Sequence, residues 1–268
     1  MYKKIILICG MPRSGTSWLG QIFDSSPEVA FRMEPLFAYC FKNCINNNSS
    51  IDNIIKYFNN VYLTDDSFIL QSENRATGSY PSFNKNEEHK ILVVKTTRHH
   101  ELLERYLLSI DNLEIISIIR HPCAVINSWI NTDREFSSKE CHVEKDWKNG
   151  GCRKTGVGEY WGFNDWVNVT KLHEDLHRKY KNFNIVKYSD LLADSYNVVG
   201  NLFELTGIAF SQQTKGFLTE CNTKHNNDPY SVFKNKLVID AWKKSLPEKI
   251  SEEIYEISKI CGLVEYTD

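Results

Sequence analysis

Short, mainly apolar runs recur along the chain. The five runs are Ile5–Cys9, Val29–Met33, Ile91–Val94, Ile115–Ile119 and Ile185–Tyr188. Apolar runs of this length are typical of strands that are buried on both faces, as in a parallel sheet. The segments between them have helical periodicity, and alternating strands and helices predict a doubly wound α/β fold. We therefore expect a mainly parallel sheet with helices on both faces.

The segments between the runs differ in regularity. The spacing of apolar residues predicts helices at Ile51–Phe58, Glu159–Tyr180, Ser195–Thr206, Val238–Leu246 and Pro247–Ile260. Residues 38–90 and 131–165 contain asparagine-rich or glycine-rich stretches, which favour loops. We expect both to be insertions into a single domain that spans residues 1–268. Within the second insertion, residues 131–158 could form a mobile flap or a plain surface loop.

Charge and hydropathy argue against several classes of function. The 268-residue chain has a net charge of −2, and its basic residues form no long tract, so no nucleic-acid partner is indicated. No segment approaches the roughly 20 apolar residues that a membrane span needs. The first predicted strand begins at Ile5, which leaves no room for a secretory signal, so we expect a cytoplasmic protein. The sequence does not indicate an oligomeric state.

The eight cysteines contain no C-x-x-C pair, which argues against a zinc ribbon. We expect most of them to be reduced thiols that pack as small apolar side chains. Cys141 and Cys152 flank a loop and could form a disulfide if the protein were exported.

The strongest chemical signal follows the first apolar run. The stretch Gly10-Met-Pro-Arg-Ser-Gly-Thr-Ser-Trp18 joins this strand to the start of a helix. In such a loop the backbone N–H groups and the positive end of the helix converge on an anion, so we expect a phosphorylated ligand. The spacing matches the loop of P-loop nucleotide-triphosphatases and predicts their three-layer architecture, but Thr16 stands where that loop carries its lysine. The only cation inside the loop is Arg13.

Two motifs together resemble the sulfotransferase family. Pro12-Arg-Ser-Gly-Thr-Ser-Trp-Leu19 is similar to the 5′-phosphosulfate loop of that family. Arg120-His-Pro122, with Ser128 eight residues after the arginine, is similar to its 3′-phosphate motif. The resemblance implies the sulfate donor 3′-phosphoadenosine-5′-phosphosulfate (PAPS), used without a metal. It also implies transfer of a sulfuryl group to a hydroxyl of a small-molecule or carbohydrate acceptor, whose pocket the two insertions would shape.

The resemblance also assigns contacts to the donor. Arg13 would stabilise charge on the bridging oxygen, and the 5′-phosphate pocket would be completed by Ser14, Gly15, Thr16 and Ser17. Arg120 and Ser128 would hold the 3′-phosphate. Tyr188 resembles a family tyrosine that approaches the adenine, and Trp18 could stack on the same ring, although both could equally be core residues. Lys234, ahead of Trp242, resembles a basic residue that closes over the 3′-phosphate.

We predict Glu34 to be the base that accepts the acceptor's proton. Phenol and steroid sulfotransferases carry a histidine after K-T, whereas this chain has Thr97 after Lys95 and Thr96. Glu34-Pro35 instead resembles the glutamate-proline of carbohydrate and tyrosylprotein sulfotransferases, whose glutamate is the base. Burial could raise the pKa of Glu34 toward the working pH, or Lys95 and Arg98 could position its carboxylate.

Each of these residues also has a simpler interpretation. Glu34 could be a surface glutamate that pairs with Arg32, and Lys95 could be solvated rather than bound to the sulfonate. His99 and His100 are expected at a helix start, although either could substitute as the base.

Three other functions compete with sulfuryl transfer. His173-Glu-Asp-Leu-His177 matches the H-E-x-x-H motif of zinc proteases, but the surrounding charges favour a solvated helix face. A kinase-like phosphotransferase would need Mg²⁺ ligands and the missing loop lysine. A nucleotide-binding module without catalysis would bind the donor product and show no turnover.

Overall fold

The computed structural model describes residues 2–224, 231–233 and 240–268. Its centre is a five-stranded parallel sheet in the order β2-β3-β1-β4-β5. The strands are β1 (Lys4–Cys9), β2 (Val29–Met33), β3 (Ile91–Thr96), β4 (Leu113–Ile119) and β5 (Phe183–Lys187). Strands that follow β1 in the chain lie on both sides of it, so the sheet is doubly wound as predicted.

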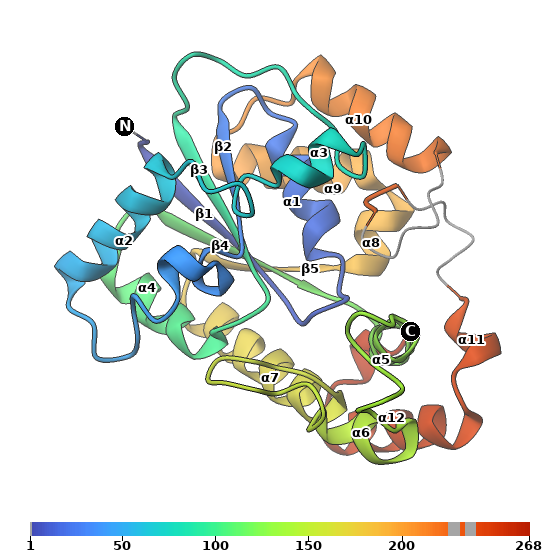
Figure 1. The fold of residues 1–268 in the computed structure, drawn as a ribbon. Helices are drawn as coiled ribbons and strands as arrows, with labels where there is room; N and C mark the ends of the chain where they lie inside the picture. Colours follow the sequence, from blue (N-terminus) through green and yellow to red (C-terminus); the bar gives the residue numbers. More distant parts are fainter. Residues whose placement is uncertain (1, 225–230, 234–239) are drawn as a thin grey trace.

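Helices cover both faces of the sheet (Figure 1). One face is covered by α1 (Thr16–Asp24), α8 (Tyr188–Ala193), α9 (Ser195–Thr206) and α10 (Gln212–Thr223). The other is covered by α2 (Ile51–Leu63), α4 (Leu103–Ser109) and α7 (Phe163–Lys179). A further group contains α5 (Pro122–Ile130), α6 (Val143–Asn149), α11 (Trp242–Ser245) and α12 (Glu248–Ile260). Shorter elements are α3 (Ser72–Ala76), η1 (Pro35–Phe37), η2 (Tyr39–Phe41), η3 (His100–Leu102) and η5 (Val264–Tyr266).

The position of β1 between two layers of helices explains why its run is apolar throughout. Ile6 and Ile8 pack toward α1 and α9, whereas Ile5, Leu7 and Cys9 pack toward α2, α4 and α7. Successive side chains of a strand point to opposite faces, so a strand between two helical layers has no face left for polar residues. The three-layer architecture therefore follows directly from the run.

The segment 131–165 is more ordered than its glycine content predicted. It contains α6 and packs Phe136, Trp147 and Trp161 into a buried cluster with Trp129. Cys141 and Cys152 form a disulfide within it. Of the two states that the sequence left open for this pair, the reduced one is therefore wrong in this structure. The six other cysteines are free thiols, as expected for most of the set.

The predicted elements differ from the observed ones mainly at their ends. Tyr188 begins α8 instead of ending β5, and α7 begins at Phe163, four residues later than predicted. The helix predicted at Val238–Leu246 lies partly outside the described residues, and the described part is helical only at Trp242–Ser245. Among the residues that the structure describes, no helix has the length and apolar content to cross a bilayer.

Candidate active site

A cavity of about 640 Å³ lies at the carboxyl ends of the strands. This is where open α/β sheets bind their ligands. The predicted site residues that line it are Arg13, Gly15, Thr16, Ser17, Trp18, Glu34, Lys95, Arg120, Ser128 and Tyr188. Side chains that follow β1, β2, β3, β4 and β5 thus meet in one cavity.

Gly15 brings the start of α1 to the cavity wall. It is the N-cap residue of α1 and has a φ of 94°, in the region that favours glycine. A Cβ atom at this position would lie 2.7 Å from the ring of Tyr188. Any other residue would therefore push the ring away and strain the turn. The positive end of α1 faces the cavity as a result, which favours an anionic ligand.

Two arginines connect the loop after β1 with the turn after β4. Arg13 Nε donates to Ser128 Oγ at 3.1 Å, and Arg13 Nη1 lies 3.6 Å from Glu135 Oε1. Arg120 Nη1 donates to the backbone oxygen of Arg13 at 3.0 Å, and its guanidinium lies 4.6 Å from the centre of the Tyr188 ring. Two guanidinium groups in one cavity suit a ligand with two separate anionic groups.

Glu34 lies at the end of β2 and is held by the residues that follow β3. Its Oε1 accepts hydrogen bonds from Lys95 Nζ at 2.8 Å, Thr97 N at 2.9 Å and Thr97 Oγ1 at 2.7 Å. Among the residues that the structure describes, its Oε2 accepts only a longer bond, 3.3 Å, from Thr96 Oγ1. The backbone of Glu34 is left-handed, with a φ of 44°. One carboxylate oxygen is therefore saturated with donors, and the other keeps capacity to accept a proton.

Comparison with known proteins places this arrangement in a family. Residues 3–261 match the sulfotransferase domain. The chain belongs to the sulfotransferase domain family. It is therefore an enzyme of sulfuryl transfer.

Relatives of this sulfotransferase are distant. Mouse carbohydrate sulfotransferase 5 is 23% identical over 318 residues, which cover 96% of this chain and 78% of that protein. A mouse sulfotransferase complexed with PAP has a similar fold, with a TM-score of 0.60, 16% identity, and coverage of 99% of this chain and 90% of that one. The sulfotransferase domain from the curacin biosynthetic pathway has a TM-score of 0.55 and 14% identity, and the match covers 96% and 97% of the two chains.

The charge state of Glu34 follows from its partners. Burial alone raises the pKa of this carboxyl. The Lys95 charge, the hydrogen bonds from Lys95 and Thr97 and the nearby Arg98 together lower it by more than burial raises it, so the pKa lies below its ordinary value. Of the two explanations for a working carboxylate, positioning is supported and a raised pKa is not. Lys95 is 6% exposed, so it is not a solvated lysine.

Arg32, His99 and His100 are the alternatives for pairing with Glu34 or replacing it as the base, and each has other partners or lies away from the cavity. Arg32 donates to the backbone oxygens of Phe31, Val61 and Tyr62 rather than to Glu34. His99 is at the start of η3 and contacts Glu101 through Nδ1 at 2.9 Å, and His100 is buried within η3. Neither histidine lines the cavity.

One predicted donor contact, that of Ser14, is not reproduced, and another falls on a residue that the structure does not describe. Ser14 is 1% exposed, does not line the cavity, and its N–H donates to the backbone oxygen of Met11 at 3.1 Å. Its amide therefore stabilises the loop and is engaged away from the predicted 5′-phosphate pocket. Lys234 lies outside the described residues.

Sequence reasoning missed several residues of the site. Thr97 was noted only because it replaces a histidine, yet it supplies two of the donors to Glu34. Glu135 contacts Arg13 from the segment that was expected to be a loop. Phe37 and Phe68 line the cavity with ring centres 5.5 Å apart. These contacts join residues that are distant along the chain, so no local pattern marks them.

His121 occupies the position where the family often has aspartate. Its Nδ1 accepts a hydrogen bond from the N–H of Cys123 at 3.1 Å and so caps α5, the role that an aspartate side chain would also perform. Its ring stacks on Trp242 with centres 4.6 Å apart. His121 therefore still caps α5, the helix that carries Ser128, although it departs from the family pattern.

The zinc-protease motif on α7 is divided by the fold. His173 is 1% exposed and points toward the sheet, whereas His177 lies near the surface and its Nδ1–H donates to the backbone oxygen of Phe183. The prediction of a solvated helix face is wrong for His173. The two histidines do not share one ligand, so a zinc-protease function has no geometric support.

Proposed function

We propose that this sulfotransferase moves the sulfuryl group of PAPS to a hydroxyl of a carbohydrate acceptor, with Glu34 as the base. The observation that carries this proposal is the shared cavity, in which two guanidinium groups lie near the positive end of α1 and the Glu34 carboxylate lies at the neighbouring strand end. The mouse sulfotransferase of similar fold was crystallised with PAP, the product that PAPS leaves after transfer. The same two-phosphate ligand suits Arg13 and Arg120.

In the proposed step, the acceptor oxygen attacks sulfur in line with the bond to the 5′-phosphate. A new S–O bond forms while the S–O bond to the bridging oxygen breaks, and the electron pair stays on the 5′-phosphate. Arg13 and the N-terminus of α1 stabilise this developing charge. The acceptor proton passes to Glu34 Oε2, which accepts one long hydrogen bond from the described part of the chain.

Glu34 would act as an ionised, positioned carboxylate. Its lowered pKa keeps it deprotonated at neutral pH, and its three donors fix Oε1 so that Oε2 has one orientation. Because the carboxylate is already oriented, the reaction avoids the entropy cost of bringing a free base to the acceptor. Lys95 holds the carboxylate and lines the same cavity, so its ammonium also lies within reach of the sulfonate region.

A sugar is the acceptor that the cavity wall supports best. Phe37 and Phe68 are 47% and 40% exposed, and Gln71 and Asn74 line the cavity with them. A pyranose presents C–H groups that pack on aromatic rings and hydroxyls that bond to amides. The relation to mouse carbohydrate sulfotransferase 5 supports the same class of acceptor.

We propose that the transfer itself needs no metal, which separates it from a kinase reaction. P-loop kinases use Mg²⁺ and a loop lysine to neutralise phosphate charge. Here Thr16 replaces that lysine, and the cationic groups at the cavity are side chains. Transfer from PAPS that persists in a chelator and a lack of ATP consumption are the expected results.

The proposal is tested with radiolabelled PAPS and a panel of glycans, phenols and peptides. Glu34→Gln should lower kcat by about 10²- to 10⁴-fold, the usual contribution of a general base. Its affinity for adenosine 3′,5′-bisphosphate, measured by calorimetry, should stay within about threefold because Glu34 touches no donor phosphate in this scheme. Glu252→Gln on the exposed face of α12 is the control. Retained turnover in Glu34→Gln would move the base to another group.

A further inference from the structure

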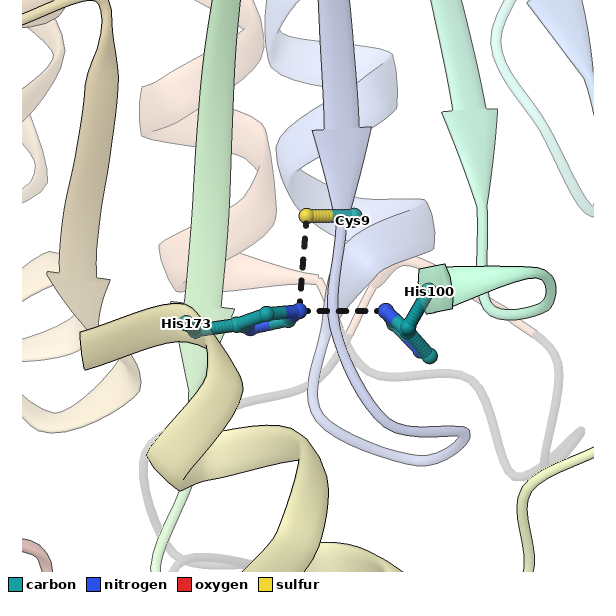
Figure 2. A group of neighbouring side chains, drawn as sticks. All are labelled: Cys9, His100 and His173. Atoms are coloured by element: carbon teal, nitrogen blue, oxygen red, sulfur yellow. Dashed lines mark hydrogen bonds between the residues drawn. The ribbon is translucent and has the colours of Figure 1, made fainter. Parts of the chain in front are cut away.

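Three potential metal ligands meet beneath the phosphate-binding loop, outside the transfer cavity. Cys9 ends β1, His100 lies in η3 after β3, and His173 lies on α7. Figure 2 shows the three side chains pointing toward one another from these separate elements. His173 Nε2 lies 4.0 Å from Cys9 Sγ and 3.1 Å from His100 Nδ1, and the three ligand atoms all lie within 4.8 Å of one another.

The spacing of these atoms is near that of a tetrahedral metal site. With Zn–S of about 2.3 Å and Zn–N of about 2.0–2.1 Å, neighbouring ligand atoms of a tetrahedral zinc ion lie roughly 3.3–3.8 Å apart. The two separations from His173 Nε2, 3.1 and 4.0 Å, bracket that range, and the separation between Cys9 and His100 is within 4.8 Å. All three side chains are almost fully buried, at 0% for Cys9, 1% for His100 and 1% for His173. Small side-chain rotations would therefore complete the site without opening the fold.

Ser117 orients the central histidine. Its Oγ lies 2.6 Å from His173 Nδ1, and Ser117 is itself fully buried on β4. When His173 Nδ1–H donates to this hydroxyl, the lone pair of Nε2 faces Cys9 and His100. Metal-bound histidines are usually held in this way, with the second ring nitrogen donating to a neighbouring oxygen.

We propose that Cys9, His100 and His173 bind a zinc ion. One thiolate and two imidazoles are a ligand set that zinc prefers, and the three protein ligands leave a fourth position for a small ligand such as water. Binding converts the Cys9 thiol to a thiolate, whose proton leaves to solvent, so the bound ion and thiolate together carry one net positive charge. The site uses only one histidine of the H-E-x-x-H motif.

The position of the ion predicts an effect on the donor pocket. Cys9 is followed directly by Gly10 at the start of the phosphate loop, and His100 is three residues after Thr97, which holds Glu34. The ion would connect β1, η3 and α7 directly below both. A net positive charge at this place favours anion binding in the loop above it. Zinc-loaded protein should therefore bind adenosine 3′,5′-bisphosphate more tightly than zinc-free protein.

The test measures metal content, which does not depend on sulfotransferase activity. Because the ligands are buried, the chain is expressed in zinc-supplemented or cobalt-supplemented medium, so that the ion enters as the protein folds. After dialysis against a chelator, elemental analysis should find about one zinc ion per chain. The cobalt form should show the near-ultraviolet band of a thiolate–cobalt bond. The background for both is Cys40→Ser/Cys44→Ser, since these two cysteines are exposed.

Matched variants identify the ligands. Cys9→Ser and His173→Asn should lose most of the bound metal, while Cys123→Ser and His177→Asn should retain it. Cys123 is also a buried free thiol, and His177 lies one turn from His173 on the same helix. Circular dichroism verifies that each variant folds, and His100→Asn provides a third ligand variant if one of the others does not. A folded parent chain without zinc, or equal zinc in the ligand and control variants, would overturn the proposal and leave a hydrogen-bonded Ser117–His173–His100 chain.

Discussion

Thr97 donates both its backbone N–H and its hydroxyl to one oxygen of Glu34, at 2.9 and 2.7 Å. The residue that stands where related phenol and steroid enzymes carry a histidine thus positions a carboxylate that comes from another strand. In the proposed mechanism, this relation leaves the second oxygen of Glu34 to accept the proton. Replacements at Thr97 and around it should therefore act on the proposed base without removing it.

Thr97→Val keeps the shape of the side chain and removes the hydroxyl donor. We expect kcat to fall by about 10- to 150-fold, because a hydrogen bond to a charged group contributes roughly 1.5–3 kcal/mol. Donor affinity should be unchanged, which steady-state kinetics and calorimetry with adenosine 3′,5′-bisphosphate would establish together. Thr97→Ser, which retains the hydroxyl, should recover most of the activity. Equal activity of the valine and serine variants would exclude the positioning role.

Lys95→Met removes the charge that lowers the pKa of Glu34. Burial is then opposed mainly by the hydrogen bonds from Thr97 and by Arg98, so the pKa of Glu34 rises. Because only the ionised carboxylate can accept the proton, activity in the variant should be lost at higher pH than in the parent chain as the pH falls. The pH profile of kcat measures this shift. A profile that keeps its acidic limb in place would mean that another group limits the reaction.

Arg120→Ala should weaken binding of the donor's 3′-phosphate without affecting binding of its 5′-phosphate. Loss of a charge-assisted contact costs about 1.5–3 kcal/mol, so the affinity for adenosine 3′,5′-bisphosphate should fall by roughly 10- to 150-fold. Binding of adenosine 5′-monophosphate should change by less than about threefold, because this ligand lacks the 3′-phosphate. Equal losses for the two ligands would indicate that Arg120 acts by holding the backbone of Arg13 rather than the 3′-phosphate.

The Cys141–Cys152 disulfide closes a loop with a sequence separation of 11 residues. Replacing both cysteines by serine should lower the free energy of unfolding by about 2–3 kcal/mol through restored freedom of the unfolded chain. Urea unfolding of the parent and the variant measures the difference. Replacing Cys221, a buried free thiol, by serine is the control, because it removes no cross-link from the unfolded chain.

Thiol labelling of the protein in its native cell tests the expected cytoplasmic location, because disulfides persist mainly in oxidising compartments.

His121 makes stability depend on pH. Burial is the largest effect and lowers its pKa from 6.5 to about 4; the hydrogen bond to the backbone of Thr267 opposes it, and smaller effects come from Lys243 and Arg120, which lower the pKa, and Asp240, which raises it. Since the folded pKa lies below the unfolded one, its contribution is present above pH 6.5 and is lost as the pH falls from 6.5 toward 4. Protonation would also place a hydrogen on Nδ1, opposite the Cys123 N–H that it accepts.

His121→Asn keeps a neutral cap and removes the titration. Between pH 6.5 and 4, the parent chain should lose on the order of 1–2 kcal/mol more stability than this variant. Urea unfolding at several pH values measures both. Tyr255, which lies 3.2 Å from His121 Nε2, does not titrate in this range and should not contribute. Parallel curves for the two chains would contradict the assignment.

Much of this protein was already determined by local sequence. Each strand is a run of mainly apolar residues long enough to cross a sheet, so the five strands and the doubly wound order of layers could be predicted. The two segments proposed to bind the phosphates could also be predicted, because in each an arginine shortly precedes a helix start, and the first also contains glycines. Ser195–Thr206 was predicted to the residue, since an aspartate cap and Gly207 mark its two ends.

The tertiary structure alone decided which distant groups meet. Glu34 and Thr97 are 63 residues apart, and Cys9 and His173 are 164 residues apart. Such pairs are selected by strand order and by the face of a strand on which a side chain lies, and neither leaves a periodic signal in the sequence. Burial is likewise a property of the whole fold, which is why His173 was expected in water and lies against the sheet. The reaction class followed from short motifs, whereas the state and partners of each charged group followed from packing.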